Sequence, residues 1–514
     1  MWYLFGRRLL GSVFSPRRSK GGPRPQHRPS LEPLEDRCAP AVVTTLQDGI
    51  GIHSLRDAIA AGGTVTFAAG LHGTIHLMSN LGPLTITQNV TINGPGPAVI
   101  TVSGDGAIGV FSITGGTAVN ISGLRIFDGN VEGDGAGIDS TTENLPLTLT
   151  NCEFNGNIAG GGGGAIALSG NDSSLILVSC SIVGNREMGN DNTGGGAILT
   201  IGGPVMLTNC GLIGNTGDQV GGGAIATEGA SVTGVGCVMN GNNTNGEEGG
   251  GAIDSQGGDV MLTDSTLMGN QAANGNEFSF GGGAINSGMG SITLVRSTVS
   301  NNLSAGLEGG GGIDCEGGNV MLTNSTMSGN RATNSGAGSF GGGAIFTRSE
   351  QLIVVINSTI YGNFAAGKEG GGGIAAEGSE IGLVNTIVAG NSAFGPGPDI
   401  LGPLALADHI LISDGSTTGL VNGVNGNLVG RPGHVINPLL GPLQYNGGPT
   451  PTLALLPGSP AIDAGEDSVL GPPDNLTTDQ RGFPRKFGPH VDIGAFEFEP
   501  LAPPPPHGRR NGPL

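Results

Sequence analysis

Apolar residues recur at fixed offsets through the middle of this chain, in short runs separated by glycine. Between residues 121 and 400, each unit has a glycine cluster, an Ala-Ile or similar pair, two short strand-like runs and a closing asparagine. The isoleucines after the glycine clusters, spaced by 27 to 32 residues, are Ile138, Ile166, Ile198, Ile225, Ile253, Ile285, Ile313, Ile345 and Ile374. A period near 28 residues without ten-residue apolar helices predicts an all-β fold, a parallel β-helix.

Alignment of the units on their closing asparagine predicts which side chains fill the interior. The positions three, eight and ten residues before it are almost always apolar, as in Phe154, Leu149 and Leu147. The spacing of two between the last two positions is that of one strand face. The closing asparagines are Asn130, Asn157, Asn185, Asn215, Asn242, Asn270, Asn302, Asn330, Asn363 and Asn391. We expect their amides to stack as a structural hydrogen-bonded ladder.

Two further rows have the same period. A second polar row supports the structural interpretation of the asparagines; it consists of Asn151, Asn209, Asn324, Asn357 and Asn385, with Asp264 in one unit. Cys152, Cys180, Cys210 and Cys237 occupy one position of four successive units, and serine or threonine follows in later units. Side chains of in-register parallel strands point the same way about 4.8 Å apart, a poor start for disulfide geometry. We therefore expect free thiols packed as small residues, with Cys315 in a different row.

The ends of the chain differ from the repeats. Residues 1–40 form a basic segment that we expect to be disordered and to serve in targeting, and 41–120 an N-terminal cap with the first coils. In the cap, residues 54–59 predict a short helix with Ser54 as N-cap and Leu55, Ala58 and Ile59 on one face. Strands are predicted at 64–67, 74–77, 84–87, 90–93 and 99–103. After the repeats of 121–400 we place irregular coils or a connector at 401–428, a small domain at 429–498 and a Pro-rich, disordered tail at 499–514.

Composition and charge remove several classes of protein. Glycine makes up 102 of 514 residues but comes in clusters, which excludes the collagen repeat. The net charge is −20, and residues 121–400 carry six basic against 25 acidic side chains, so nucleic acid is excluded as a partner of the repeats. No window has the 18 apolar residues of a membrane-spanning helix, and the first thirty residues lack a clear signal-peptide core.

Three segments resemble known bacterial surface proteins. Residues 429–498, with Asp479-Gln480-Arg481-Gly482 near their end, resemble a choice-of-anchor Q domain. The Gly-Gly-Ala-Ile and Phe154-Asn155-Gly156-Asn157 units resemble polymorphic outer-membrane-protein repeats over about 280 residues. Leu31 to Arg37 resemble a short signature near the start of some surface proteins. The resemblance implies a right-handed parallel β-helix displayed outside the cell, extracellular or associated with the outer membrane.

Parallel β-helices also include polysaccharide lyases and glycoside hydrolases, so the fold leaves function open. All eight histidines lie outside the repeats, which leaves no imidazole there for acid–base chemistry. The acids expected to face outward beside the strand isoleucines are Asp139, Asp254 and Asp314, with Asn286 between the last two. Asp254 and Asp314 are two coils apart, about 9.6 Å, near the outer limit for an inverting carboxylate pair. Arg296 and Arg348 are the nearby basic residues, and solvated surface charge is the favoured reading of the acids.

The sequence therefore favours a non-enzymatic surface protein with an adhesive or envelope role, and the alternative is a polysaccharide lyase or glycoside hydrolase. It assigns no catalytic, cofactor-binding or metal-ligating residue, although an acidic row is compatible with weak calcium binding. Asp463, Asp479 and Asp492 are expected to cap turns, with cation binding as the alternative. The inserts at 274–280 and 334–340 end in phenylalanine, which we expect to form packing lids rather than partner contacts. Partners are expected among polysaccharides or other cell-surface components, and no oligomeric state follows.

Overall fold

The computed structural model describes residues 39–500, apart from 190–193, 219–220, 247, 274–279, 337–338 and 349. The chain divides into two compact units, Met1–Ala39 and Pro40–Leu514. The fold described below is that of the second unit. The surface-protein signature at 31–37 and Cys38 lie outside the described residues.

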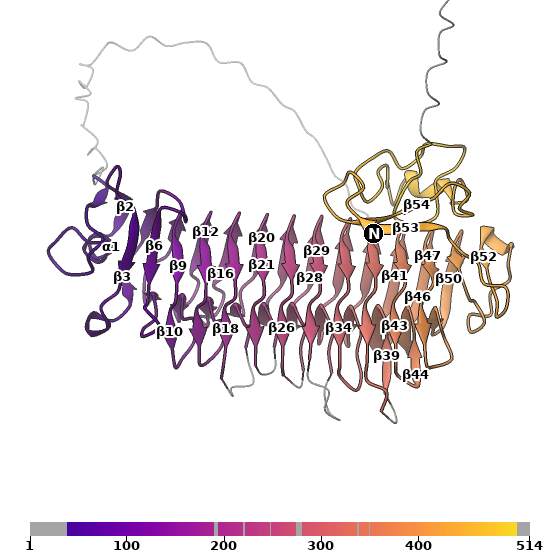
Figure 1. The fold of residues 1–514 in the computed structure, drawn as a ribbon, viewed down its shortest axis with the longest axis horizontal. Coiled ribbons are helices and arrows are strands. Elements are labelled where there is room, and N and C mark those ends of the chain that lie inside the picture. The colour runs from indigo at the N-terminus through magenta and orange to yellow at the C-terminus, as the bar shows by residue number, and fades with distance from the viewer. Residues whose placement is uncertain are drawn as a thin grey trace, which may run out of the picture. The chain divides into compact units, whose positions relative to one another are not determined.

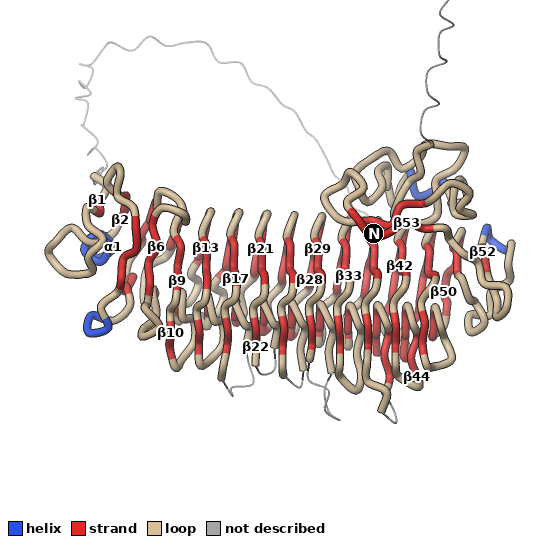
Figure 2. The backbone as a smooth tube through the Cα atoms, viewed as in Figure 1, coloured by secondary structure: helices blue, strands red, loops and turns tan. Residues whose placement is uncertain are grey.

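The second unit contains a right-handed parallel β-solenoid of about 13 turns, which confirms the predicted fold class (Figures 1 and 2). A representative coil consists of β11 (Ile138–Ser140), β12 (Pro146–Thr150), β13 (Glu153–Asn155) and β14 (Ile158–Ala159). Each strand pairs in parallel with its counterpart one coil later, so that Ile138 lies beside Ile166. The repeat found in the sequence is therefore one coil of the solenoid.

These pairings build four parallel sheets, named A to D here, and a coil passes through them in the order C, A, B, D. Sheet A has 14 strands, from β1 (Ala41–Val43) to β50 (Leu404–Asp408). Sheet B has 14, from β3 (Gly73–His76) to β52 (Leu428–Val429). Sheet C has 12, from β4 (Leu84–Ile86) to β49 (Ile400–Leu401), and sheet D has ten, from β10 (Asn130–Val131) to β48 (Ser392–Ala393).

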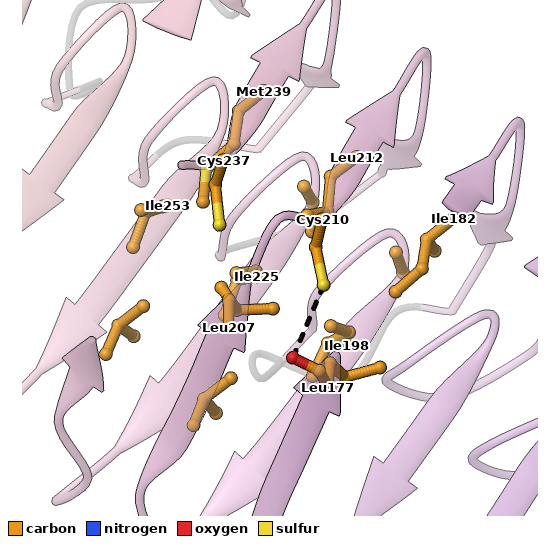
Figure 3. Packing of buried hydrophobic residues seen from close by; sticks show 14 of the residues in the cluster. Leu177, Ile182, Ile198, Leu207, Cys210, Leu212, Ile225, Cys237, Met239 and Ile253 are labelled. Atoms are coloured by element: carbon orange, nitrogen blue, oxygen red, sulfur yellow. Dashed lines mark hydrogen bonds between the residues drawn. The ribbon is translucent and has the colours of Figure 1, made fainter. Parts of the chain in front are cut away.

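The interior of the solenoid is filled by the predicted apolar rows. Leu147, Leu149 and Phe154 are all 0% exposed, and the corresponding residues of later coils are buried with them. Figure 3 shows how Leu177, Ile198 and their neighbours point into this core. Each such side chain contributes about 1.5–3 kcal/mol by leaving water, so the stack is held mainly by its apolar rows.

The asparagine ladder is present in nine consecutive coils. The side-chain amide of Asn270 donates to Oδ1 of Asn302 at 3.0 Å and to the carbonyl of Met239 at 3.0 Å, and the backbone N–H of Asn270 donates to the same Oδ1 at 2.8 Å. The same pattern repeats from Asn157 to Asn363, and these side chains are at most 1% exposed. The predicted structural ladder is confirmed for these residues.

The two ends of the ladder differ from the prediction. Asn130 does not belong to it: the backbone N–H that donates to Oδ1 of Asn157 is that of Gly129, and the Asn130 amide donates to Gly106. The register pairs Asn130 with Ile158, the residue after Asn157. Gly129 therefore occupies the ladder position of this coil, and the predicted position was wrong by one residue. At the other end Asp399, which the sequence did not single out, accepts from the backbone and side chain of Asn391 and from Ser413.

The second asparagine row is structural, as expected, but it differs from the ladder in its backbone conformation. Asn151 (φ 50°), Asn209 (φ 53°) and their counterparts adopt the left-handed conformation at the corner between sheets A and B. Asparagine tolerates this conformation better than most side chains, which explains the composition of the row. The amide stacking expected there is found between Asn385 and Asn357, at 3.1 Å. This row is therefore mainly a corner row.

The described cysteines are free thiols, as predicted, both in the row of four and at Cys315. Cys152, Cys180, Cys210, Cys237 and Cys315 are all free and at most 2% exposed. The thiol of Cys210 donates to the carbonyl of Leu177, one coil earlier, at 3.4 Å (Figure 3). Burial raises the pKa of the Cys237 thiol to about 11, which keeps it protonated and unreactive near neutral pH.

The N-terminal cap contains the predicted helix and strands. Helix α1 (Leu55–Ala61) begins after Ser54, whose side chain forms a capping box with Asp57, and it buries Leu55, Ala58 and Ile59. The first strands are β2 (Gly63–Phe67), β3, β4, β5 (Val90–Asn93) and β6 (Ile100–Ser103), within a few residues of the predicted ranges. A carboxylate–guanidinium pair, Arg56 with Asp48 at 2.8 Å, fixes the cap.

The C-terminal segment packs against the outer face of sheet B. It contains one antiparallel pair, β53 (Leu440–Gln444) and β54 (Thr452–Leu455), and little other regular structure. Gln480, 0% exposed, donates to Thr298 at 2.8 Å and to Thr450 at 2.9 Å and accepts from Thr326 at 2.6 Å. The Asp-Gln-Arg-Gly motif thus includes a buried hydrogen-bonding anchor between this segment and the solenoid.

Candidate functional site

The predicted acidic residues lie in one row of sheet C. Each of these residues is the second residue of its strand. The row contains Asp139 in β11, Asp254 in β27 (Ile253–Gln256), Asn286 in β31 (Ile285–Ser287) and Asp314 in β35 (Ile313–Cys315). The expectation that they face solvent is wrong for three of them. Asp254 is 2% exposed, Asn286 4% and Asp314 0%. Surface charge therefore does not describe these residues.

The glycine clusters explain this burial. A Cβ atom at Gly250 would lie 1.8 Å from the carbonyl oxygen of Ile253 and 2.8 Å from the backbone nitrogen of Asn286. A Cβ atom at Gly282 would likewise lie 1.8 Å from the carbonyl oxygen of Ile285 and 2.8 Å from the backbone nitrogen of Asp314. The chain before each sheet C strand thus lies so close to these strands that only glycine fits, and this packing helps to close off the acidic row.

The hydrogen bonds of the row are incomplete. The amide of Asn286 donates to Oδ1 of Asp254 at 2.7 Å, and Gln256 donates to the same oxygen at 3.2 Å. Oδ1 of Asn286 is buried without a hydrogen-bond partner, and no side chain donates to the carboxyl group of Asp314, on which only the backbone N–H groups of Gly281 and Cys315 act as donors. Burial raises the pKa of Asp254 to about 6, with the charges of Glu248 and Glu316 adding to the effect. Burial also raises the pKa of Asp314 well above its usual range, and the charge of Glu316 acts in the same direction.

A column of alternating acidic and aromatic residues precedes the glycine clusters. Its members in successive coils are Glu248, Phe280, Glu308, Phe340 and Glu369, and backbone bridges join Phe280 to both glutamates beside it. Arg348 pairs with Glu308 and lies over the rings of Phe280, at 4.9 Å, and Phe346, at 5.4 Å. Alignment on the closing asparagine did not reveal this column, whereas alignment on the glycine clusters would have done so.

The two phenylalanines of this column come from the predicted inserts. Residues 274–279 and 337–338 lie outside the described residues, but Phe280 and Phe340 are described and half-buried. Phe280 packs under Arg348, and Phe340 lines a small pocket of about 120 Å³ with Phe346 and Glu377. The packing role expected for the inserts is seen at Phe280.

Asp139 occupies a different environment from the rest of its row. It lines an open pocket of about 650 Å³ together with Phe111, Asn130, Glu132 and Asp134. Burial raises the pKa of Asp139 to about 6, and the charge of Asp134 contributes. A carboxyl group with a pKa near neutrality in an open pocket has the properties of a general acid or base.

A second pocket brings together two histidines that are far apart in the sequence. His409 and His490 line about 380 Å³ with Asp463, Glu466 and Asp467. Nδ1 of His409 lies 2.7 Å from Asp408, and Nδ1 of His490 lies 3.4 Å from Asp467. Asp467 also pairs with Lys486. The sequence predicts that the repeats contain no histidine. This pocket lies outside the repeats, where the C-terminal segment meets the last coils.

The C-terminal acids mainly order loops. Asp479 accepts from the backbone of Arg481 and Phe483 and pairs with the Arg481 guanidinium at 2.7 Å. Asp492 accepts from the backbone of Asp463 and Phe498. Turn capping is therefore confirmed for Asp479, whereas Asp492 joins segments that are 29 and six residues apart in the chain. Oδ1 of Asp463 is buried and accepts no hydrogen bond.

The described residues contain neither a ready-made metal site nor a membrane-spanning helix. In residues 39–500, outside the gaps named above, no group of three or more His, Cys, Asp or Glu side chains is placed to hold a metal ion. Within the same part of the chain, no helix has both the length and the apolar character needed to cross a bilayer. Neither the acidic row nor the histidine pocket thus contains a ready-made site of three such ligands.

Comparison with known proteins finds similarity in solved structures alone. No family model and no curated protein sequence matches the chain. The solenoid is similar to a solved mannuronic-acid-specific polysaccharide family 6 lyase from the human gut microbiota, at 13% identity and a TM-score of 0.32. The match covers 74% of this chain and 88% of the lyase. At that TM-score we transfer neither activity nor site residues from the lyase.

Proposed function

We propose that this protein is a non-enzymatic β-solenoid of the cell surface that binds polysaccharide or another surface component. The observation that carries the proposal is the burial of Asp254 and Asp314, the acid pair of the repeats that the sequence offered as a candidate for a glycosidase. Carboxylates closed off by the glycine clusters do not reach a sugar chain. The asparagine ladder and the cysteine row are likewise directed into the wall of the solenoid, where they join coil to coil.

Placement outside the cell rests on the resemblance of residues 429–498 and of the repeats to bacterial surface proteins. Protease treatment of intact cells, followed by detection of the full chain, tests it. Digestion on intact cells is the expected result. Full protection, with digestion only after lysis, would contradict the surface placement.

A second function is favoured by the pocket around Asp139. Its raised pKa and its open setting suit a polysaccharide-degrading enzyme in which Asp139 is the acid or base. The test is incubation of the full chain with a panel of acidic and neutral polysaccharides, with calcium or a chelator, while new reducing and unsaturated ends are followed. We expect binding without cleavage. Cleavage that is lost in Asp139→Asn but kept in Asp254→Asn would establish the enzyme instead.

A further inference from the structure

The outer face of sheet A carries two rows of side chains without an ionisable group. The rows cross nine strands, from β12 to β46 (Glu380–Val384), which follow one another along the solenoid (Figure 1). Row one consists of Thr148, Ile176, Met206, Thr233, Met261, Thr293, Met321, Val354 and Gly382. Row two consists of Thr150, Val178, Thr208, Val235, Thr263, Val295, Thr323, Ile356 and Val384. We call these two rows the sheet A face.

The sheet A face exposes large apolar side chains in a strongly acidic chain. Met206, Met261 and Met321 are 38%, 48% and 44% exposed. The net charge of the chain is −20, yet none of it lies on this face, and at one border Asp264 is paired with Arg296 at 2.7 Å. Two copies of so acidic a chain repel each other, and the repulsion is weakest where an uncharged face meets an uncharged face. A continuous exposed apolar face of this kind is typical of a contact surface.

The neighbouring sheet shows that this chain already buries such a surface under protein. Across the corner from row two, Thr298, Thr326 and Thr359 of sheet B are at most 2% exposed. The C-terminal segment covers them and forms hydrogen bonds with all three hydroxyl groups. The sheet A face offers the same mixture of threonine and apolar side chains directly beside this interface. It therefore continues an interface that the chain fills on one side only.

The side chains of row one also suit packing against a copy of themselves. Methionine and threonine alternate from Met206 to Met321, so the methionines lie two coils, or about 9.6 Å, apart. A two-fold axis parallel to the strands and midway between two coils pairs each coil with one an odd number of coils away. It can place Met261 opposite Thr293 of the second copy and Thr233 opposite Met321. Large side chains then meet small ones, as close packing requires.

We propose that the sheet A face is the contact surface of a homodimer, with a second copy of this chain as its occupant. Eight steps of about 4.8 Å make the face about 38 Å long, and four residues of strand make it about 13 Å wide. Its projected area is roughly 500 Å² per copy and roughly 1,000 Å² for the pair, which is where specific interfaces begin. The dimer should therefore be reversible, with a dissociation constant in the micromolar range.

Sedimentation velocity of the full chain, between about 1 and about 100 µM, tests the proposal. We expect monomer at the lowest concentration and dimer at the highest. Met261→Glu and, independently, Met321→Glu bring a carboxylate from each copy into the contact and should weaken association at least about tenfold. Met188→Glu is the control, because Met188 is 51% exposed after β18 (Arg186–Glu187) of sheet D and should not affect the dimer. Raising NaCl from about 0.05 to about 0.5 M should strengthen the dimer, since salt screens the repulsion between the acidic chains.

Four outcomes would overturn the proposal. One is a wild-type chain that stays monomeric at every concentration, and another is a dimer that both face variants leave intact, which would place the contact elsewhere. A dimer that dissociates as salt is added would be held by ionic contacts instead. A monomer that binds an uncharged polysaccharide, and loses that binding in Met261→Glu, would assign the face to a sugar chain. Circular dichroism of each variant checks that the solenoid is retained, and the second face variant replaces the first if one fails to fold.

Discussion

Two buried polar rows run along this solenoid, and they differ in how completely they are hydrogen-bonded. In the asparagine ladder, Asn157 to Asn363 each donate to the next coil and accept from the previous one. In the acidic row, Asp254 accepts from the side chain of Asn286, whereas no side chain donates to Asp314 and only backbone N–H groups act on it. Both rows are almost completely shielded from water. Burial alone therefore does not distinguish a structural row from a candidate ligand site.

The difference comes from the chemistry of one functional group. An amide carries both a donor and an acceptor, so it can repeat from coil to coil without limit. An ionised carboxylate only accepts, so it fits at the end of such a row and not in its middle. Asp399 shows the favourable case, because it ends the ladder and accepts from Asn391 on one side and Ser413 on the other. Asp314 is the unfavourable case, and its burial raises its pKa well above the usual range.

The largest loss of stability is expected when the asparagine ladder is interrupted. Asn270→Ala would leave the amide and backbone N–H of Asn242 without their acceptor. Each orphaned buried donor costs about 1–3 kcal/mol, so we expect a loss of about 4 kcal/mol in the free energy of unfolding, read from urea denaturation. Asn120→Ala, an exposed asparagine of sheet A, is the matched control. Equal midpoints for the two variants would contradict the structural reading of the ladder.

The pH dependence of the acidic row gives the next largest effect. The pKa of Asp254 rises from 3.8 to about 6 on folding, so its stabilising contribution is complete below pH 4 and is lost as the pH rises through about 6. Asp254→Asn should remove this loss, which makes the variant about 3 kcal/mol more stable than the wild type at pH 7.5 in chelator. Denaturation across pH 4 to 8 measures it. Parallel curves for wild type and variant would show that the row is not strained, and exposed Asp172→Asn serves as control.

The third prediction concerns Gln480, a buried and hydrogen-bonded side chain that belongs to neither row. Gln480→Leu would leave the hydroxyl groups of Thr298, Thr326 and Thr450 with fewer partners under the C-terminal segment. We expect a loss of about 2 kcal/mol and earlier proteolytic cleavage within residues 429–498 than in the wild type. Gln444→Leu, at an exposed position of the same segment, should be cut at the wild-type rate. Unchanged cleavage of Gln480→Leu would mean that other contacts hold this segment.

The smallest effect is expected in the cysteine row. Serine takes this position in later coils, as in Ser265 and Ser297, where its hydroxyl donates to a carbonyl as the thiol does. Cys180→Ser should therefore change the unfolding free energy by less than about 1 kcal/mol. The wild type should also unfold at the same midpoint with and without a thiol oxidant. A loss as large as that of Asn270→Ala would show that the thiols are more than small packing residues.

Much of the solenoid could be predicted from the sequence because its interactions repeat. The period of two within Leu147 and Leu149, and the period near 28 between units, report which side chains face the interior. The ladder residues follow from the same alignment, with the exception of Asn130. The prediction is wrong by one residue there, because Gly129 occupies the ladder position. Helix α1 was predictable because its N-cap and apolar face are local features.

The candidate site was predictable only in part. Strand periodicity places Asp254 and Asp314 on the side away from the core, but it carries no information about what lies on that side. Their burial depends on the glycine clusters, which pack against the strands that follow them. The pocket of His409 and His490 was also out of reach, because it forms only when the C-terminal segment packs beside the last coils.

By itself, the sequence determined the class of fold, the interior rows and the free thiols, because each coil repeats the same short-range pattern and the rows align by register. Only the tertiary structure decided which buried polar residues have hydrogen-bond partners. That outcome depends on contacts between segments distant in the chain, such as Gln480 with Thr298, and on loops folded back over sheet C. The same carboxyl group ends the ladder at Asp399 and is a buried group without a side-chain donor at Asp314, and the difference lies in its neighbours in space.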